Sequence, residues 1–176
     1  MGLGQYEDLS KVEHRTYQPR LKAETAEIDK AVSMIASAKK PLFYCGGGVI
    51  NSGPQACRQL DRFVKLTGAP ITLTLMGLGA YPGTDKQFLG MLGMHGTYEA
   101  NLAMHNADLI IAVGSRFDDR ITGRLDAFAP KSKKIHIDID PSSINKNVQV
   151  DLPIVGDVGN ILDQVLKTWK AKRLKM

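Results

Sequence analysis

The segment Asn106-Ala-Asp-Leu-Ile-Ile-Ala-Val-Gly-Ser-Arg-Phe-Asp-Asp-Arg120 joins an apolar run to a glycine and a cluster of charged residues. Leu109 to Val113 is continuously hydrophobic, which is typical of a strand buried on both faces of a parallel sheet. Gly114 and Arg116 follow it directly. Because open α/β sheets bind ligands beyond the carboxyl ends of their strands, this segment predicts both a fold class and a ligand site.

The rest of the chain alternates between apolar runs and helical periodicity. Further strands are expected at residues 42–45, 71–75, 135–140 and 153–155. Helices are expected at residues 24–38, 54–67, 97–106 and 157–169. This alternation predicts an α/β fold, an open and mostly parallel sheet of about five to six strands with helices on both faces, Rossmann-like and of the DHS-like nucleotide-binding type. Residues 79–96 are glycine-rich without a clear period and are expected to form a functional loop.

Length and composition predict one domain outside the membrane. The chain has 176 residues, of which 43% are hydrophobic and 23% charged. Residues 1–22 are polar and are expected to form a linker or tail, with the domain at 23–173. No apolar run reaches the roughly 20 residues of a transmembrane helix, and the N-terminus lacks the pattern of a signal peptide. Cys45 in a predicted apolar strand and Cys57 on a helical face suit reduced thiols better than a disulfide, so a cytoplasmic location is expected.

The net charge of +5 does not predict a nucleic-acid partner. The excess of lysines lies in residues 131–134 and in the tail from residue 167, without the interleaved aromatic residues of a base-stacking surface.

Gly46, Gly47 and Gly48 stand between a predicted strand and a predicted helix, where free N–H groups could receive an anion. The spacing departs from the dinucleotide fingerprint, since Asn51 occupies the third glycine position. A plain tight turn is the alternative interpretation. Arg116 has a planar guanidinium that could reach a pyrophosphate or a flavin edge, and an ion pair with Asp118 or Asp119 is equally compatible with the sequence.

Two carboxylates and a histidine complete the candidate set. Asp138 and Asp140 end a predicted strand and could accept ribose hydroxyls or cap the following turn. His95 could contact a ring or be structural, whereas His136 is expected to be a strand residue without a partner. Zinc-ligand spacing and nucleophile motifs are absent from the sequence. The residues therefore indicate binding and show no set of catalytic groups.

Five motifs carry a family resemblance: Tyr44-Cys-Gly-Gly-Gly48, Thr74-Leu-Met-Gly-Leu-Gly79, Leu92-Gly-Met-His-Gly-Thr97, Gly114-Ser-Arg-Phe-Asp-Asp-Arg-Ile-Thr-Gly123 and His136-Ile-Asp-Ile-Asp-Pro141. Together and in this order they resemble acetohydroxyacid synthase (acetolactate synthase). The match is to the central domain of the large catalytic subunit and covers about Tyr17 to Trp169.

The resemblance implies a thiamine-diphosphate enzyme that condenses two 2-ketoacids with loss of CO2 in branched-chain amino-acid biosynthesis. Its flanking domains supply an activating glutamate and bind thiamine diphosphate through magnesium, while the central domain binds FAD, which has no net redox role. The implied partners are those flanking domains, further copies in a homodimer or tetramer, and a small regulatory subunit. Because the thiamine-diphosphate motifs are absent from these 176 residues, the segment alone is expected to be inactive.

The resemblance also assigns roles by position, with neither a catalytic residue nor a metal ligand among them. The residues implied to contact FAD are Gly46, Gly47, Gly48, Thr74, Leu75, Met76, Met94, His95, Gly96, Thr97, Gly114 and Arg116. Asp138, Ile139 and Asp157 are implied to lie toward its ribose and adenine end. Asp119 and Arg120 correspond to the mouth of a substrate channel.

Two other classes of protein are alternatives to this one. A free-standing NAD-linked module of sirtuin-like type would need a catalytic histidine and usually a zinc ribbon of paired cysteines, which two isolated cysteines cannot form. A structural domain with an empty pocket would need neither Arg116 nor the Gly-Met-His-Gly run, and these two features favour the FAD domain.

Overall fold

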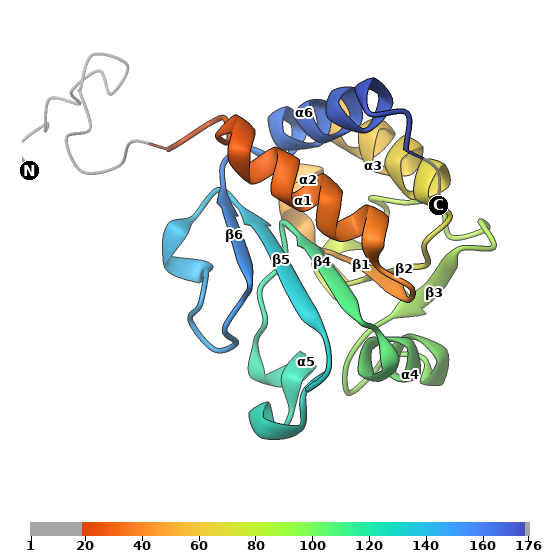
Figure 1. The fold of residues 1–176 in the computed structure, drawn as a ribbon. Coiled ribbons are helices and arrows are strands. Elements are labelled where there is room, and N and C mark those ends of the chain that lie inside the picture. The colour runs from red at the N-terminus through yellow and green to blue at the C-terminus, as the bar shows by residue number, and fades with distance from the viewer. Residues whose placement is uncertain (1–18, 175–176) are drawn as a thin grey trace, which may run out of the picture.

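A computed structural model describes residues 19–174, so the predicted tail lies outside the described residues as far as residue 18 (Figure 1). The sheet has six strands in the order β3-β2-β1-β4-β5-β6, and every neighbouring pair is parallel. The strands are β1 (Pro41–Cys45), β2 (Ile71–Leu73), β3 (Phe88–Met91), β4 (Leu109–Val113), β5 (Lys133–Asp138) and β6 (Leu152–Val155). The predicted fold class is confirmed.

Helices cover both faces of the sheet. Figure 1 shows α1 (Thr25–Ser37), α3 (Pro54–Thr67) and α6 (Val158–Ala171) together on one side. On the other side are α4 (Tyr98–Asn106) and the short α5 (Asp119–Thr122). The short α2 (Gly47–Asn51) follows β1, and single 3-10 turns η2 (Leu75–Gly77), η3 (Leu125–Ala127) and η4 (Pro141–Ser143) lie in the connections.

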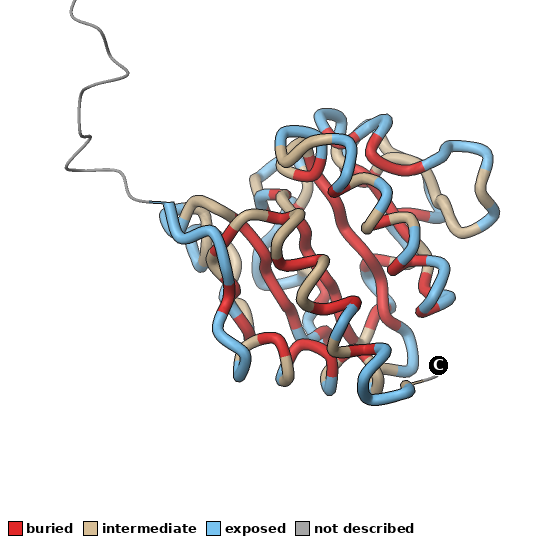
Figure 2. Tube along the Cα trace, turned by 90° about the horizontal axis from the view of Figure 1, so that it is seen from above, coloured by how far each residue is buried: buried red, intermediate tan, exposed pale blue. Residues whose placement is uncertain are grey.

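The strand β4 divides two hydrophobic cores. Leu109, Ile111 and Val113 belong to the larger core under α1, α3 and α6, where Trp169 packs edge-on against a phenylalanine of α3. Ile110 and Ala112 belong to the smaller core on the opposite side. All five residues of β4 are buried, and Figure 2 shows red, buried stretches of chain running through the middle of the molecule. This double-sided burial confirms the interpretation of the uninterrupted apolar run.

The ligand-binding edge of the sheet is set by its topology. From β1 the chain continues to β2 and β3 on one side, and from β4 it continues to β5 and β6 on the other. The carboxyl ends of β1 and β4 are therefore neighbours from which the connections diverge. This is the topological switch point at which open α/β sheets bind ligands.

Glycines bring the ends of β1 and β4 into direct backbone contact. The Gly46 N–H donates to the Val113 carbonyl and the Gly48 N–H to the Gly114 carbonyl, both at 3.0 Å. A Cβ atom on Gly48 would lie 2.6 Å from the Gly114 Cα, and Gly114 itself has a φ of +55°. No other residue fits at such a contact without displacing the backbone.

Several predicted elements differ from the structure. The strand predicted at 71–75 ends at Leu73, because the Thr74 side chain accepts the Gly77 N–H (3.0 Å) and begins η2. The loop predicted at 79–96 contains β3, whose residues are only partly buried and include Gly90 with a φ of +94°. The glycine segment after β1 forms α2 rather than an open turn. A half-buried, glycine-interrupted edge strand carries too weak an apolar pattern to be recognised.

Candidate functional site

A cavity of about 620 Å³ lies beyond the carboxyl ends of β1 to β5. Its wall is built from the segments that follow five successive strands of the sheet. Cofactor and small-molecule sites have volumes of roughly 300 to 1,000 Å³. The cavity therefore has the position and the size of a nucleotide site at a switch point.

Most of the sequence-predicted residues meet in this cavity. Those that line it are Gly46, Gly47, Gly48, Thr74, Leu75, Met76, Met94, His95, Gly114, Arg116, Asp138 and Ile139, together with the predicted channel residue Arg120. These residues are far apart in the sequence, and parallel strand ends bring them to one edge.

Four predicted residues do not line the cavity: Gly96, Thr97, Asp119 and Asp157. The Thr97 hydroxyl accepts the Ala100 N–H (3.2 Å) and caps α4, and a Cβ atom on Gly96 would collide with the Met91 carbonyl. Asp119 is exposed on α5.

Asp157 is the fourth of these residues, and both of its carboxylate oxygens are engaged. Oδ1 accepts the Asn160 N–H (2.9 Å) and thereby caps α6. Oδ2 accepts the Ser52 hydroxyl at 2.7 Å. Asp157 therefore ties the C-terminal end of α2 to the start of α6, beside the cavity rather than in its wall.

The structure adds residues that sequence reasoning did not select. These additional cavity residues are Ile50, Asn51, Met91, Leu92, Ser115, Asp118, Ile121 and Ser143. Ile50 and Asn51 belong to α2 and Met91 to β3, two elements that the sequence did not reveal. Ser115 and Asp118 flank Arg116, and a consideration of the whole β4 end rather than of one charge could have found them.

The expected role as a source of free N–H groups is wrong for Gly46 and Gly48. The N–H groups of Gly46 and Gly48 are bonded to the ends of β4, at Val113 and Gly114. These two glycines permit the close approach of two strands, so neither N–H is free for an anion. The helix that follows has only five residues.

Arg116 is one of two arginines in the cavity wall, the other being Arg120. The Arg116 side chain is exposed, and neither Asp118 nor Asp119 lies within 4.0 Å of the guanidinium in the described part of the chain. Of the two interpretations left open by the sequence, the structure therefore does not show the internal ion pair. An unpaired guanidinium at a strand end can take a phosphate with two parallel hydrogen bonds.

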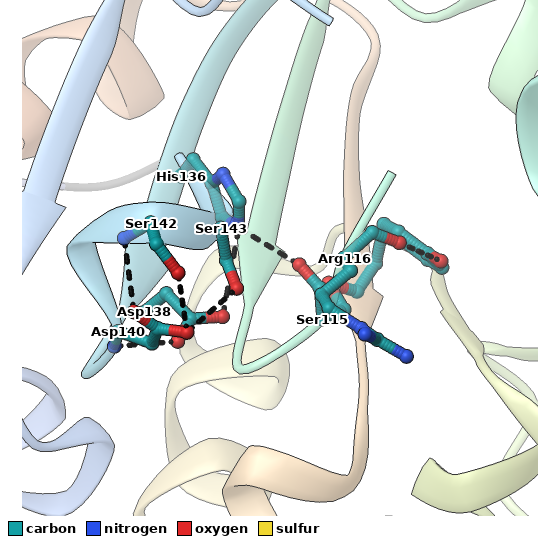
Figure 3. A network of polar contacts seen from close by, with 8 residues as sticks. Ser115, Arg116, His136, Asp138, Asp140, Ser142 and Ser143 are labelled. Atoms are coloured by element: carbon teal, nitrogen blue, oxygen red, sulfur yellow. Dashed lines mark hydrogen bonds and ion pairs between the residues drawn. The ribbon is translucent and has the colours of Figure 1, made fainter. Parts of the chain in front are cut away.

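The end of β5 carries a polar network (Figure 3). Asp140 accepts the Ser142 N–H (2.9 Å) and hydroxyl (2.8 Å), and these bonds lower the pKa of Asp140. Asp140 thus caps the turn η4, the alternative that the sequence had left open. Asp138 lines the cavity, and its Oδ1 accepts the Asp140 N–H (2.9 Å). Its Oδ2 is 3.8 Å from the ring of His136, beyond hydrogen-bond distance.

His136 is fully buried, and the expectation that it has no partner was wrong. Its Nε2 lies 2.8 Å from the Ser115 carbonyl, and its ring packs edge-on against Phe117. Burial lowers the pKa of His136, against a smaller opposite effect of Asp138. The ring is therefore neutral near pH 7, and the Nε2–H group donates to Ser115.

One side of the cavity is apolar and exposed. Leu75, Met76 and Met94 are 69%, 75% and 78% exposed, which is high for large apolar side chains. His95 lies next to Met94 in the same wall. Such a surface can cover a planar apolar ring, and methionine adapts its shape to one.

Residues 19–174 contain neither a candidate metal site nor a helix that could span a membrane. No group of three or more His, Cys, Asp or Glu residues in this range could hold a metal ion. No helix in the same range is long and apolar enough to cross a membrane.

Comparison with known proteins gives one family. Residues 28–165 match the model of the thiamine pyrophosphate enzyme central domain. The chain is 51% identical over 170 residues to the acetolactate synthase large subunit of Haemophilus influenzae, covering 97% of the chain and 29% of that protein. It is 50% identical over 156 residues to the acetolactate synthase isozyme 3 large subunit of Escherichia coli, covering 89% and 27%. It is 49% identical over 150 residues to the acetolactate synthase of Mycobacterium bovis, covering 85% and 24%. The chain thus spans less than a third of the length of these relatives.

Proposed function

Because the chain belongs to the central-domain family of the thiamine pyrophosphate enzymes, we propose that it is the FAD-binding central domain of an acetolactate synthase large subunit. The longer enzyme condenses pyruvate with pyruvate or 2-ketobutyrate and releases CO2, in branched-chain amino-acid biosynthesis. The names of relatives about 50% identical over most of the chain support this activity.

The cavity at the β1–β4 switch point is the observation that carries the FAD proposal. Its volume suits a cofactor, its exposed apolar wall suits the isoalloxazine ring, and the unpaired guanidinium of Arg116 suits a phosphate or the ring edge. Asp138 and Ile139 would meet the ribose and adenine end, where the Asp138 Oδ2 can accept a hydroxyl. The proposed contacts of Gly96, Thr97 and Asp157 depend on the family resemblance alone, since these residues lie outside the cavity wall.

The family resemblance implies how the chemistry is divided between this domain and the rest of the longer enzyme. FAD has no net redox role in the condensation, and the carbon chemistry is supplied by thiamine diphosphate with Mg²⁺ in other domains of the longer enzyme. Residues 19–174 contain no cluster of metal ligands. This domain would hold FAD, and Asp119 and Arg120 would lie at the mouth of the substrate channel.

The proposed partners are the thiamine-diphosphate domains of the same subunit, further copies in a dimer or tetramer, and a small regulatory subunit. The large-subunit names of the relatives support a small subunit. We also propose that the longer enzyme is located in the cytoplasm. Neither nucleic acid nor membrane is expected as a partner.

Flavin fluorescence tests the FAD proposal directly. Titration of FAD with the chain should quench its fluorescence, and Arg116→Ala should weaken binding by about 10- to 100-fold, the effect of losing a charge-assisted hydrogen bond. Arg62→Ala, an exposed arginine of α3 outside the cavity, is the matched control and should bind like the parent. If the parent chain does not quench FAD even at high concentration, the proposal is wrong for these 176 residues by themselves, because they do not form the flavin site without the rest of the longer enzyme.

The second test concerns catalysis by the 176 residues alone. With thiamine diphosphate, Mg²⁺, FAD and pyruvate supplied, the purified polypeptide should form no acetolactate. Appreciable turnover would show that the catalytic machinery lies within these residues, contrary to the proposal.

A further inference from the structure

The segment after β4, which we name the β4 tail (residues 114–118), has every one of its backbone carbonyls engaged by another group of the protein. At its two ends, the Gly114 carbonyl accepts the Gly48 N–H (3.0 Å), and the Asp118 carbonyl accepts the N–H groups of Ile121 (3.1 Å) and Thr122 (3.0 Å). The three carbonyls between them are held by side chains.

These three side chains come from three different parts of the fold. The Ser115 carbonyl accepts from His136 Nε2 of β5 at 2.8 Å, the contact drawn in Figure 3. The Arg116 carbonyl accepts from the Tyr44 hydroxyl of β1 at 3.0 Å. The Phe117 carbonyl accepts from Asn147 Nδ2, in the segment before β6, at 2.8 Å.

The donors are themselves fixed in place. Tyr44 and His136 are fully buried, and their rings pack against Phe117 at centroid distances of 5.6 and 5.3 Å. Burial also raises the pKa of Tyr44, so its hydroxyl keeps the proton that it donates. The Ser115 hydroxyl also donates a hydrogen bond to the Tyr44 carbonyl at 2.9 Å, so β1 and the β4 tail are joined by two hydrogen bonds that involve Tyr44.

None of the three donors lines the cavity, whereas Ser115, Arg116 and Asp118 of the β4 tail do. Carbonyls that already accept these bonds are not available to the ligand. The Gly114 N–H and the Ser115 hydroxyl are also engaged, with the Ile137 and Tyr44 carbonyls, so the β4 tail offers the cavity chiefly the side chains of Arg116 and Asp118. In the absence of these bonds, an exposed arginine on an irregular segment would sample many directions, and ordering it would cost binding energy.

We propose that Tyr44, His136 and Asn147 are positioning residues: they hold three successive carbonyls of the β4 tail and so orient Arg116 toward the ligand before it binds. This inference rests on the proposed flavin contact of Arg116. It adds three residues outside the cavity wall, the buried Tyr44 and His136 and the exposed Asn147, that act on affinity without touching the ligand.

A double-mutant cycle tests whether Tyr44 acts through Arg116. Tyr44→Phe removes one hydroxyl and keeps the ring on Phe117, and it should weaken FAD binding by about three- to tenfold, the effect of one neutral hydrogen bond. In an Arg116→Ala background the same change should have almost no effect, because the group that Tyr44 orients is gone. Tyr81→Phe makes the same change at another buried tyrosine outside the cavity and should bind FAD like the parent.

His136 offers a rescue experiment. His136→Leu removes the donor to the Ser115 carbonyl and should weaken FAD binding, whereas His136→Gln places an amide N–H near the position of Nε2 and should restore most of the affinity. Asn147→Ala should weaken binding as Tyr44→Phe does, with Asn106→Ala on the exposed face of α4 as the matched control.

A second measurement is independent of flavin. Backbone ¹⁵N order parameters of Arg116 and Phe117 should be near 0.85 in the parent chain and fall toward about 0.6 in Tyr44→Phe, while Tyr81→Phe leaves them unchanged. If they do not fall, or if Tyr44→Phe weakens FAD binding equally with and without Arg116, the positioning role is wrong. If they fall but the parent chain does not bind FAD, the role in ordering Arg116 stands and the proposed ligand is wrong.

Discussion

Substitution of Gly114 by alanine is the sharpest test of how the ends of β1 and β4 build the floor of the cavity. A Cβ atom there would lie 2.7 Å from the Gly48 Cα and 2.9 Å from both the Gly48 carbonyl carbon and the Val49 nitrogen. Carbon atoms in contact are normally 3.5 to 4.0 Å apart, so the two chain segments must separate by about 1 Å. The Gly48–Gly114 hydrogen bond, now 3.0 Å, would then be lost.

The cost has three parts. Forcing a methyl group into a packed site costs about 1 to 3 kcal/mol. The lost hydrogen bond costs about 1 kcal/mol, and an alanine at the positive φ of Gly114 costs about 1 to 2 kcal/mol. The sum is a loss of about 3 to 6 kcal/mol in the free energy of unfolding, a large share of the roughly 5 to 15 kcal/mol of a typical domain.

Gly68→Ala is the matched control for this variant. Gly68 ends α3 with a φ of +68°, close to that of Gly114, but no atom lies within 4 Å of the position of a Cβ atom there. It should therefore show only the backbone cost of about 1 to 2 kcal/mol. Urea unfolding followed by circular dichroism measures both variants. If Gly114→Ala costs no more than Gly68→Ala, the close approach of the two strands is not the reason for a glycine at position 114.

Three further predictions concern single polar groups. Burial lowers the pKa of His136, so below about pH 6.5 this histidine is protonated in the unfolded chain but not in the folded one. The free energy of unfolding from urea titrations should therefore be lower at about pH 5.5 than at about pH 7.5. His136→Gln should remove this difference, and an unchanged pH dependence in that variant contradicts the assignment. Thr97→Val removes the cap of α4 and should cost about 1 kcal/mol in urea unfolding, against no change for the exposed loop variant Thr84→Val. Ser52→Ala removes the hydrogen bonds from the end of α2 to Asp157 and to the Gly159 N–H (2.9 Å). Thermal unfolding should show that the free energy of unfolding falls by about 1 to 2 kcal/mol. Ser37→Ala, whose hydroxyl bonds only within α1, should not show this decrease.

The sequence alone was sufficient for those features that depend on local pattern. The run Leu109 to Val113 predicted a strand buried on both faces, and alternation along the chain predicted the parallel sheet with helices on both sides. The polar groups after each strand predicted the edge at which the cavity lies. These predictions succeed because hydrophobic periodicity and strand-end glycines are properties of neighbouring residues.

Tertiary structure alone decided which of these groups meet and which are already engaged. No local pattern distinguishes Gly48, whose N–H is bonded to the end of β4, from a glycine that contacts a ligand. The same holds for His136, whose partner is a carbonyl 21 residues away in the chain. β3 escaped notice because an edge strand is only partly buried. Hydrogen-bond partners depend on strand order and on the distance between segments remote in sequence, and these are set only when the sheet assembles.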